Sequence, residues 1–559
     1  MQGESKCGMF ENVEGGFRRA AYRGCGYDSE DIKRKPHIGI ANTYNEASPG
    51  HANLKPYIEA IKAGIWQAGG IPVEFGVPST CGNHAIGTPA LANEMAMRDL
   101  VAGSVEVVSQ IHLFDGVVLT AGCDNIVPGM MLAAARLNLP TMLFMSGPMM
   151  AGRFGNKKIT LSSINELVYG DAAICDEGKR QLEIEETLAC PTMGACPEMG
   201  TANTMQILSE AIGLTLTGNG TIPAYLNERT VNAHRTGVRI VELVNEGIRA
   251  RDIITDESIL NALMVDLTIG GSTNAVMHLL SLSREIGGTL RLEDFDSYSE
   301  KIPVYVAVSP TGTHFADEVY DAGGVPAIMH QIKEHLFLDA ITVNGNTIRE
   351  IVDGVKFVPS DVIRSHDNPV FETGGIAVVK GNLSEDGAIV RTSAMDSECK
   401  YMIGPARVFN SDTDAKNAVL EGKIKKGDII VVRYAGPAGA PGMVEIHQCN
   451  DAINGLGLGS DIAIVTDGRF SGFNHGALVG HVVPEAMHGG MIAFVEEGDK
   501  ITIDIDNRII NVDIPENILK QRKALWNKPQ LRIKNGFMRL YAENALPANL
   551  GAAMQYTDE

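Results

Sequence analysis

The sequence predicts an α/β protein that begins with a mostly parallel sheet covered by helices on both faces. Two observations carry this prediction. Short apolar runs alternate with amphipathic helical patterns through the first two thirds of the 559 residues, as expected when strands are joined by crossover helices. From about residue 370 the pattern changes to close-spaced strands broken by Gly and Asp turns, which is typical of a barrel or a sandwich.

The elements of the first part alternate in type along the chain. The expected strands cover residues 37–41, 73–77, 115–120 and 141–145, and the expected helices cover residues 54–68, 90–109 and 130–137. In a parallel sheet of this kind, ligands bind beyond the carboxyl ends of the strands, where loops lead into helix N-termini. Residues that directly follow a strand are therefore the first candidates for a functional site.

The second part contains strands without long helical patterns between them. They are expected at residues 376–379, 388–392, 428–433, 462–466, 491–496 and 500–512. The change of pattern places a domain boundary between about residues 350 and 375. At about 150 residues per domain, the length allows three or four average domains or two large ones.

The charge balance excludes several classes of function. The chain has 68 acidic and 47 basic residues and a formal net charge of −21, which argues against a nucleic-acid-binding surface because phosphates are neutralised by clustered Lys and Arg. No apolar signal segment follows Met1, and the most apolar long stretch, residues 129–152, is interrupted by Arg136 and two prolines. We therefore expect no membrane span, and a cytoplasmic enzyme.

Nine cysteines in such a chain argue for metal or catalytic use rather than for structural disulfides. TAGCDNIVPG at residues 120–129 follows a buried strand, which places Cys123 and Asp124 at its carboxyl end. There a thiolate suits a soft metal and a carboxylate a hard one, and the alternative is a buried thiol beside a helix-capping Asp. Cys190 and Cys196 share a loop of small residues, which either brings a thiolate to a cluster or forms a tight turn.

Three further Gly-rich motifs hold polar residues. GGSTNAVMHL at residues 270–279 opens a helix, where Ser272 or Thr273 either marks an anion site or caps the helix. GPAGAPGMVE at residues 436–445 ends in the carboxylate of Glu445. TDGRFSGFNHG at residues 466–476 places Ser471 beside Arg469 in a turn after a buried strand, as for an activated serine, although it is not the GxSxG elbow of hydrolases.

Together the five motifs resemble the dihydroxy-acid and sugar-acid dehydratase family, which includes 6-phosphogluconate dehydratase. The resemblance spans nearly the whole chain, because RRAAYRG at residues 18–24, KPHIGIAN at 35–42 and GHVVPEA at 480–486 also match in order and spacing. It implies an N-terminal α/β domain, residues 1–365, that binds an iron–sulfur cluster, and a C-terminal β-barrel domain, residues 366–559, that carries a catalytic serine. It also implies a homodimer or a homotetramer.

The resemblance implies a lyase that removes water from a 2,3-dihydroxy carboxylic acid. The acid is either a precursor in branched-chain amino acid biosynthesis or a sugar acid, and the resulting enol becomes a 2-keto acid. Ser471 matches the base, a serine alkoxide that needs neighbouring cations to ionise. The other matches are Cys123 and Cys196 as ligands of a [2Fe-2S] or [4Fe-4S] cluster, Asp124 and Glu445 as Mg²⁺ ligands, and Ser272, Thr273 and Arg469 as substrate contacts.

The sequence departs from the family at three positions. Gly50 stands in place of a third cluster cysteine, and Gly82 in place of an acidic metal ligand. Asn125 stands in place of a lysine that is carbamylated in known members and binds Mg²⁺. The loss of two charged ligands argues against a standard Mg²⁺ site, because that ion prefers hard, oxygen-rich coordination.

Cys81 and His84 lie in the altered segment and leave three hypotheses open. In the first, Cys81 replaces the missing thiolate and the cluster persists. In the second, Cys81 and His84 bind a softer metal such as zinc or iron together with a remaining carboxylate. In the third, the losses are neutral in a protein that no longer dehydrates. The alternatives to a dehydratase are a paralogue with shifted chemistry, such as an isomerase, and a catalytically silent binding protein.

Overall fold

The N-terminal part of the computed structural model, which describes residues 7–472, 474–531 and 533–555, is built on one sheet. Its strand order is β2–β1–β3–β4, and all three strand pairs are parallel. The strands are β1 (His37–Asn42), β2 (Ile71–Gly76), β3 (Gly116–Ala121) and β4 (Thr141–Met145). The expected parallel sheet is confirmed, and β3 and β4 are buried along their whole length, which explains their continuous apolar sequences.

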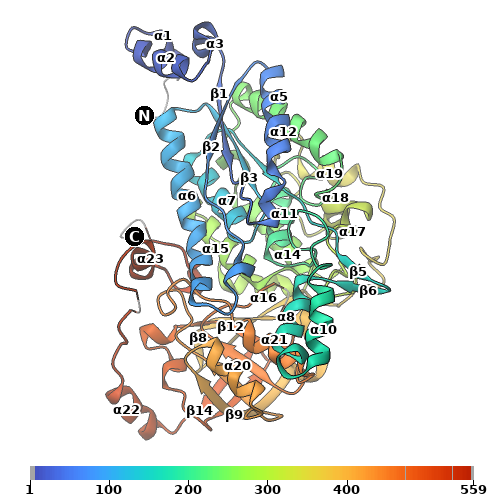
Figure 1. The fold of residues 1–559 in the computed structure, drawn as a ribbon, viewed down its shortest axis with the longest axis vertical. Helices are drawn as coiled ribbons and strands as arrows, with labels where there is room; N and C mark the ends of the chain where they lie inside the picture. The colour runs from blue at the N-terminus through green and yellow to red at the C-terminus, as the bar shows by residue number, and fades with distance from the viewer. Residues whose placement is uncertain (1–6, 473, 532, 556–559) are drawn as a thin grey trace.

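Helices cover both faces of this sheet (Figure 1). One face carries α5 (Leu54–Gln67) and α12 (Glu228–Glu246), and the other carries α6 (Asn93–His112) and α7 (Ile126–Leu137). The backbones of α5 and α12 approach closely at Gly64 and Gly237, where an added β-carbon would overlap a main-chain oxygen of the opposite helix. Two positions without a side chain therefore set the spacing of this helix pair.

The remaining helices of the N-terminal part extend the same core. The longest are α11 (Thr201–Ile212), in which every residue is buried, α14 (Asp256–Thr268) and α15 (Thr273–Ile286). The shorter ones are α1 (Cys7–Glu11), α2 (Gly15–Gly24), α3 (Ser29–Arg34), α4 (Pro49–Ala52), α8 (Leu161–Tyr169), α9 (Asp171–Ile174), α10 (Asp176–Glu185), α13 (Ala250–Ile253), α16 (Leu292–Ser299), α17 (Glu318–Asp321), α18 (Gly324–Gln331) and α19 (Ile348–Asp353). A small hairpin joins β5 (Gly152–Phe154) to β6 (Lys157–Ile159).

The C-terminal part is a closed eight-stranded barrel, which decides between the barrel and the sandwich that the strand pattern allows. Its order is β10–β11–β12–β8–β7–β14–β13–β9. The strands are β7 (Ile376–Gly381), β8 (Ser384–Arg391), β9 (Tyr401–Phe409), β10 (Ile429–Val432), β11 (Ala463–Thr466), β12 (Ala477–Val483), β13 (Lys500–Asp504) and β14 (Ile509–Asp513). The helices around it are α20 (Asp412–Leu420), α21 (Gln448–Gly455), α22 (Glu516–Leu525) and α23 (Phe537–Asn544).

Two expected strands of the second part differ in the structure. Residues 491–496 do not form a strand, because Met491–Phe494 is a 3₁₀ helix that follows two glycines. A short apolar run alone does not separate a strand from a buried helical turn. Residues 500–512 form the hairpin of β13 and β14 rather than one strand, since the Asp504 carboxylate accepts from the Asn507 amide at 3.0 Å in a turn between them.

Arg391, the last residue of β8, ties the barrel to the N-terminal part. Its guanidinium is buried and donates to the main-chain oxygens of Gly270 at 3.1 Å, Met199 at 3.2 Å and Gly472. Gly270 and Met199 belong to loops of the N-terminal part, whereas Gly472 follows the barrel strand β11. One buried cation is therefore shared across the junction of the two parts.

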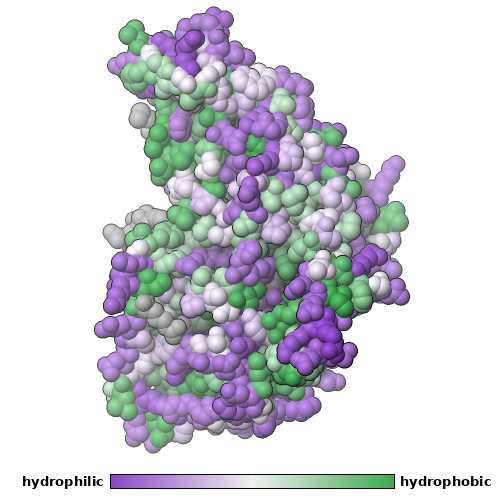
Figure 2. Space-filling model, viewed as in Figure 1, coloured by the Kyte–Doolittle hydropathy of each residue, from purple (hydrophilic) through white to green (hydrophobic). Residues whose placement is uncertain are grey.

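Apolar side chains are exposed on the N-terminal part. Figure 2 shows hydrophobic residues over α6, where Val107 and Ile111 are 55 % and 71 % exposed. Val13 and Phe17, at the start of the chain, are 95 % and 67 % exposed. Among the residues described, no helix has both the length and the apolar character that a bilayer crossing requires.

Candidate active site

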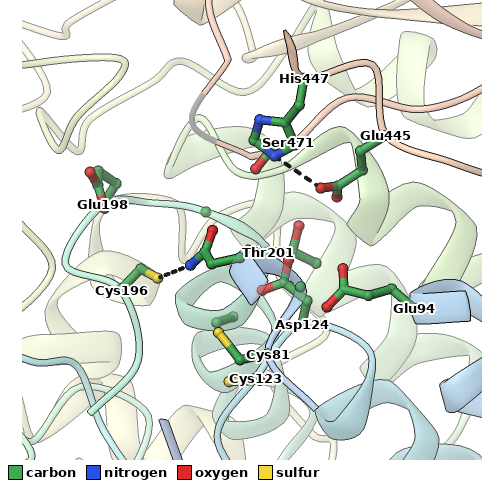
Figure 3. A pocket seen from close by; sticks show the side chains of 14 residues that line it. Cys81, Glu94, Cys123, Asp124, Cys196, Glu198, Thr201, Glu445, His447 and Ser471 are labelled. Carbon is green, nitrogen blue, oxygen red and sulfur yellow. Dashed lines mark hydrogen bonds and ion pairs between the residues drawn. The ribbon is translucent and has the colours of Figure 1, made fainter. Parts of the chain in front are cut away.

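A cavity at the carboxyl ends of the sheet strands, facing loops of the barrel, collects the titratable residues that the sequence singles out (Figure 3). We call it the central cavity; its volume is about 50 Å³, room for a few water molecules. Its lining includes the thiols of Cys81, Cys123 and Cys196, the carboxyl groups of Glu94, Asp124, Glu198 and Glu445, the imidazole of His447 and the hydroxyl of Ser471. Ser471, Cys123 and Glu445 thus face one cavity, as the predicted chemistry requires.

The strand ends explain why these residues meet. Cys123 and Asp124 follow β3, and Cys81 follows β2 at the entry to a 3₁₀ turn, so both loops leave the sheet at the same edge. Cys196 precedes α11. Ser471 follows the barrel strand β11, which places it opposite the sheet edge.

The three thiols are half-buried and neutral in the absence of a cation. Burial, together with the charges of Glu94 and Asp124, raises the pKa of Cys81 to about 11. Burial also raises the pKa of Cys123 and Cys196 well above the usual range, and Cys81 contributes to the rise at both of them. A bound metal would displace these protons. Cys190, in contrast, is exposed and does not line the central cavity.

Position 50 lies directly against one of these thiols. A β-carbon added at Gly50 would be 2.6 Å from Sγ of Cys123. A side chain at position 50 would therefore compete for the space that the Cys123 thiol now fills. The third thiol of this chain instead reaches the cavity from Cys81.

Glu445 is the most strongly stabilised carboxylate of the cavity. Its Oε1 accepts from Arg469 Nη1 at 2.5 Å and from Asn274 Nδ2 at 3.3 Å, and its Oε2 lies 3.2 Å from His447 Nε2. Burial alone would raise its pKa, but Arg469 and His447 bring the pKa to about 2. Glu445 is therefore ionised at neutral pH.

Asp124 and Glu94 share the cavity with that ionised group. Burial and the charge of Glu445 raise the pKa of Asp124 to about 6 and that of Glu94 to about 8. Glu94 comes from the first turn of α6, and its Oε2 lies 3.6 Å from Nη2 of Arg469. Sequence reasoning missed Glu94, because acidic residues are common in the first turn of any helix.

A chain of hydrogen bonds connects the loop of Ser471 to Glu445. The Ser471 amide donates to Asn474 Oδ1 at 2.9 Å, and Asn474 Nδ2 donates to Asp451 Oδ1 at 3.2 Å. His447 then lies between Asp451, 3.3 Å from Nδ1, and Glu445, 3.2 Å from Nε2. Although burial opposes its charge, these two carboxylates raise the pKa of His447 to about 10, so the imidazole is a cation at neutral pH.

Four remaining sequence candidates are not in the lining of the central cavity. Ser272 caps α15, with its Oγ accepting from the Asn274 amide at 3.2 Å, and Thr273 is the first residue of that helix. His84 places Nε2 2.5 Å from the Ala47 carbonyl oxygen, outside the lining of the central cavity. Asn125 is buried, and neither atom of its amide has a hydrogen-bond partner in the described structure.

The donor atoms around the central cavity fit the iron–sulfur cluster and the divalent cation that the family resemblance implies. Within residues 7–472, 474–531 and 533–555, no three His, Cys, Asp or Glu side chains already converge as a finished coordination sphere. The chemistry of the donors nevertheless fits, since three thiols and several carboxyl groups line the same cavity. Thiolates suit iron–sulfur clusters and carboxylates suit hard divalent cations.

A second, larger cavity of about 430 Å³ adjoins the central one and has Glu445 in both walls. We call it the outer cavity. It lies between residues 87–93 and the barrel loops, and its lining includes the apolar side chains of Leu91, Val432, Ala440 and Val444. Glu445 therefore lies between a small cavity and a wider one, whose lining mixes these apolar side chains with polar residues such as Thr88 and Ser411.

Comparison with known proteins shows the family to which the chain belongs. The model for the N-terminal domain of the dihydroxy-acid/6-phosphogluconate dehydratases matches residues 35–351, and the model for their C-terminal domain matches residues 361–552. A dihydroxy-acid dehydratase of Acetivibrio thermocellus is 44 % identical over 98 % of both chains. Those of Methanococcus aeolicus and Pyrococcus furiosus are 42 % and 41 % identical over 98 % of this chain and 100 % and 99 % of their own. The chain therefore belongs to the dihydroxy-acid/6-phosphogluconate dehydratase family.

Proposed function

We propose that this protein is a hydro-lyase that converts a 2,3-dihydroxy carboxylic acid into a 2-keto acid and water. The observation that carries the proposal is the meeting of Ser471, Cys123 and Glu445 in one cavity at the junction of sheet and barrel. Full-length relatives that carry the name dihydroxy-acid dehydratase support it. A decayed binding protein has no evident reason to keep a buried, fully partnered Glu445 opposite three thiols.

In the proposed reaction Ser471 is the base. As an alkoxide, its Oγ takes the proton from C2, and the electron pair of the C2–H bond forms the C2=C3 double bond while the C3–O bond breaks. The proton held by Ser471 then passes to the departing hydroxide, which leaves as water. The enol that remains tautomerises to the 2-keto acid. The cationic side chains of Arg469 and His447 lie beside Glu445 and supply positive charge to a site in which negative charge develops on the substrate.

Cys81, Cys123 and Cys196 are the residues that we propose hold an iron–sulfur cluster. When bound, such a cluster supplies a Lewis-acidic iron that weakens the C3–O bond. Asp124 and Glu445 are the carboxylates that we propose for a divalent cation. We leave His84 out of this set, because its Nε2 faces a main-chain carbonyl oxygen.

The outer cavity has room for the substituent of the substrate. With the carboxylate and hydroxyl groups directed to the central cavity, the rest of the acid would occupy the space beside Leu91 and Val444. Leu91 and Val444 would bury an alkyl group, whereas polar residues of the same lining, such as Thr88 and Thr413, could bind hydroxyls. Full-length relatives that carry the name dihydroxy-acid dehydratase favour the alkyl substituent. We therefore place a dihydroxy acid with an alkyl substituent ahead of a sugar acid.

The proposal includes the organisation of the protein. We place the domain boundary near residue 365, so that residues 366–559 form the barrel domain with the catalytic serine. The exposed apolar side chains over α6 and near the N-terminus support a homodimer or homotetramer. Eight described cysteines are free thiols, which suits the reducing conditions of the cytoplasm.

The test is anaerobic reconstitution with iron and sulfide, followed by detection of 2-keto acids from a panel of dihydroxy and sugar acids. We expect turnover of an alkyl dihydroxy acid, and its loss in Ser471→Ala with an unchanged circular dichroism spectrum. Ser460→Ala, which removes a hydroxyl that bonds Asp396 elsewhere in the barrel domain, is the control and should keep full activity. Absence of turnover with every acid, or full activity in Ser471→Ala, contradicts the proposal.

A further inference from the structure

The carboxyl group of Glu94 occupies the space that a side chain at position 82 would need. A β-carbon added at Gly82 would overlap the carboxyl carbon and both carboxyl oxygens of Glu94. No side chain can therefore stand at position 82 while Glu94 keeps its present place. Position 82 is where the family resemblance predicts an acidic ligand, so the carboxyl group has not been lost from the cavity but enters it from α6.

We propose that Glu94 supplies the third carboxylate of a divalent-cation site, together with Asp124 and Glu445. This inference rests on the proposed function and assigns a residue to it that the sequence did not reveal. Figure 3 shows Glu94 and Asp124 close together on the wall that faces Glu445. All three carboxyl groups line the central cavity, whose volume is about 50 Å³.

The charges around the cavity leave room for one divalent cation. Glu94, Asp124 and Glu445 contribute three carboxylates, and Asp451 contributes a fourth through His447. The cationic partners among these contacts are Arg469 and His447. With these four carboxylates ionised, the six side chains carry a net charge of about −2, which a divalent cation would offset. Glu198, the other carboxyl group of the cavity lining, is outside this group.

Glu94 can also reorient towards a bound cation more easily than Glu445 can. Its Oε2 lies 3.6 Å from Nη2 of Arg469, which is beyond hydrogen-bond distance, and that nitrogen has no hydrogen-bond partner in the described structure. Glu445, in contrast, already accepts hydrogen bonds from Arg469 and Asn274. A cation would therefore gain a carboxylate from Glu94 without breaking an existing hydrogen bond of that group.

The first test measures Mn²⁺ binding to the reconstituted protein by the electron paramagnetic resonance signal of free Mn²⁺. Mn²⁺ stands in for Mg²⁺, since both prefer oxygen ligands. We expect Glu94→Gln to weaken Mn²⁺ binding by at least about 10- to 100-fold, the loss that follows even from removal of a group that orients a ligand. The control Glu106→Gln removes a carboxylate from the same helix away from the cavity and should leave the Kd unchanged. An unchanged Kd in Glu94→Gln overturns the inference, as does absence of Mn²⁺ binding in the wild-type protein.

The second test moves the carboxylate back to position 82. Gly82→Asp alone should lower the thermal midpoint, because the new side chain meets the Glu94 carboxyl group. Glu94→Ala should lose Mn²⁺ affinity, and the double variant Glu94→Ala/Gly82→Asp should regain about tenfold of that affinity. No gain in the double variant over Glu94→Ala contradicts the shared position. Iron content and circular dichroism of each variant establish that it folds and keeps its cluster.

The two proposals fail in different ways. An active dehydratase whose Mn²⁺ affinity does not depend on Glu94 overturns the inference and leaves the proposed function intact. A protein that loses Mn²⁺ affinity in Glu94→Gln but dehydrates none of the acids overturns the function and leaves the cation site intact.

Discussion

Nε2 of His447 lies 3.2 Å from Oε2 of Glu445, and both side chains are at most 4 % exposed. A buried carboxylate of this kind is stable as an anion only if cations are held against it. His447 is one of these cations and Arg469 is the other. The second ring nitrogen of His447, Nδ1, lies 3.3 Å from the carboxylate of Asp451. The ionised state of Glu445 therefore depends on a histidine that does not belong to any of the Gly-rich motifs.

Replacing His447 should change the pH profile of the enzyme. In His447→Gln the pKa of Glu445 should rise from about 2 towards its ordinary value, because one of two neighbouring cations is gone. We expect kcat to fall about 10- to 100-fold, as for other residues that orient a ligating carboxylate. The acid limb of the pH–rate profile should also move to higher pH, which purely structural damage would not produce. An unmoved acid limb argues against this role.

Cys81 should be needed for the iron–sulfur cluster. Cys81→Ser is expected to lower bound iron and the absorbance near 400 nm after anaerobic reconstitution, because a serine oxygen is a poor substitute for a soft thiolate ligand. Cys190→Ser is the matched control, since that exposed thiol comes from the Cys196 loop and stays outside the central cavity. If Cys81→Ser bound as much iron as wild type, the third cluster ligand would be a residue other than Cys81.

Asn474 should position the catalytic loop. Its side chain accepts from the Ser471 amide and donates to Asp451, so Asn474→Ala breaks the hydrogen-bonded chain at the serine end. We expect kcat to drop about tenfold or more with little change in KM, because a misplaced base weakens transition-state contacts more than substrate binding. Steady-state kinetics measure the split, and a pure KM effect would contradict it.

His51 makes the protein sensitive to acid. Burial lowers its pKa to about 3 from 6.5, so the unfolded chain binds a proton that the folded one excludes between these values. The free energy of unfolding should fall as pH drops through this window, and His51 accounts for about 2 kcal/mol of the loss at about pH 5.

Urea unfolding at about pH 5 and about pH 7.5 measures this share of the loss. His51→Gln should show a smaller difference between the two conditions than wild type. The exposed His112→Gln should behave like wild type. Equal differences in all three proteins would exclude His51 as the source.

Ala440 should influence the size of the accepted substituent. It lines the outer cavity, so Ala440→Leu fills part of the space beside Glu445. The value of kcat/KM should fall more for dihydroxy acids with longer alkyl groups than for the shortest one, by about tenfold for a one- or two-carbon extension. A uniform fall across the series would place the substituent elsewhere.

The sequence predicts the architecture well where the pattern is long and regular. The alternation of strands and helices locates β1, β3 and β4 to within a few residues, because fully buried parallel strands have continuous apolar sequences. Short apolar runs are ambiguous, and Met491–Phe494 is wrongly predicted as a strand for that reason. The closure of the barrel follows from long-range pairing that no local pattern records.

The candidate site is only partly readable from the sequence. The loops of Cys123, Cys196 and Ser471 stand out because Gly and small residues surround a single reactive group. Glu94 and His447 do not stand out, since each lies in an ordinary helical or loop context. Their importance follows from distances across the fold, which connect the first turn of α6 and the entry to α21 to the same cavity.

The guanidinium of Arg391 has a consequence for how molecules enter and leave. Separating the barrel from the sheet would strip this buried cation of its partners in the N-terminal part, the main-chain oxygens of Gly270 and Met199. A wide hinge between the halves is therefore too costly to accompany every turnover. Substrate and product should instead pass through local movements of residues at the cavity entrance. Selectivity among acids would then be set by the short stretch that precedes α6 and lines the outer cavity, rather than by rigid-body movement of the two parts.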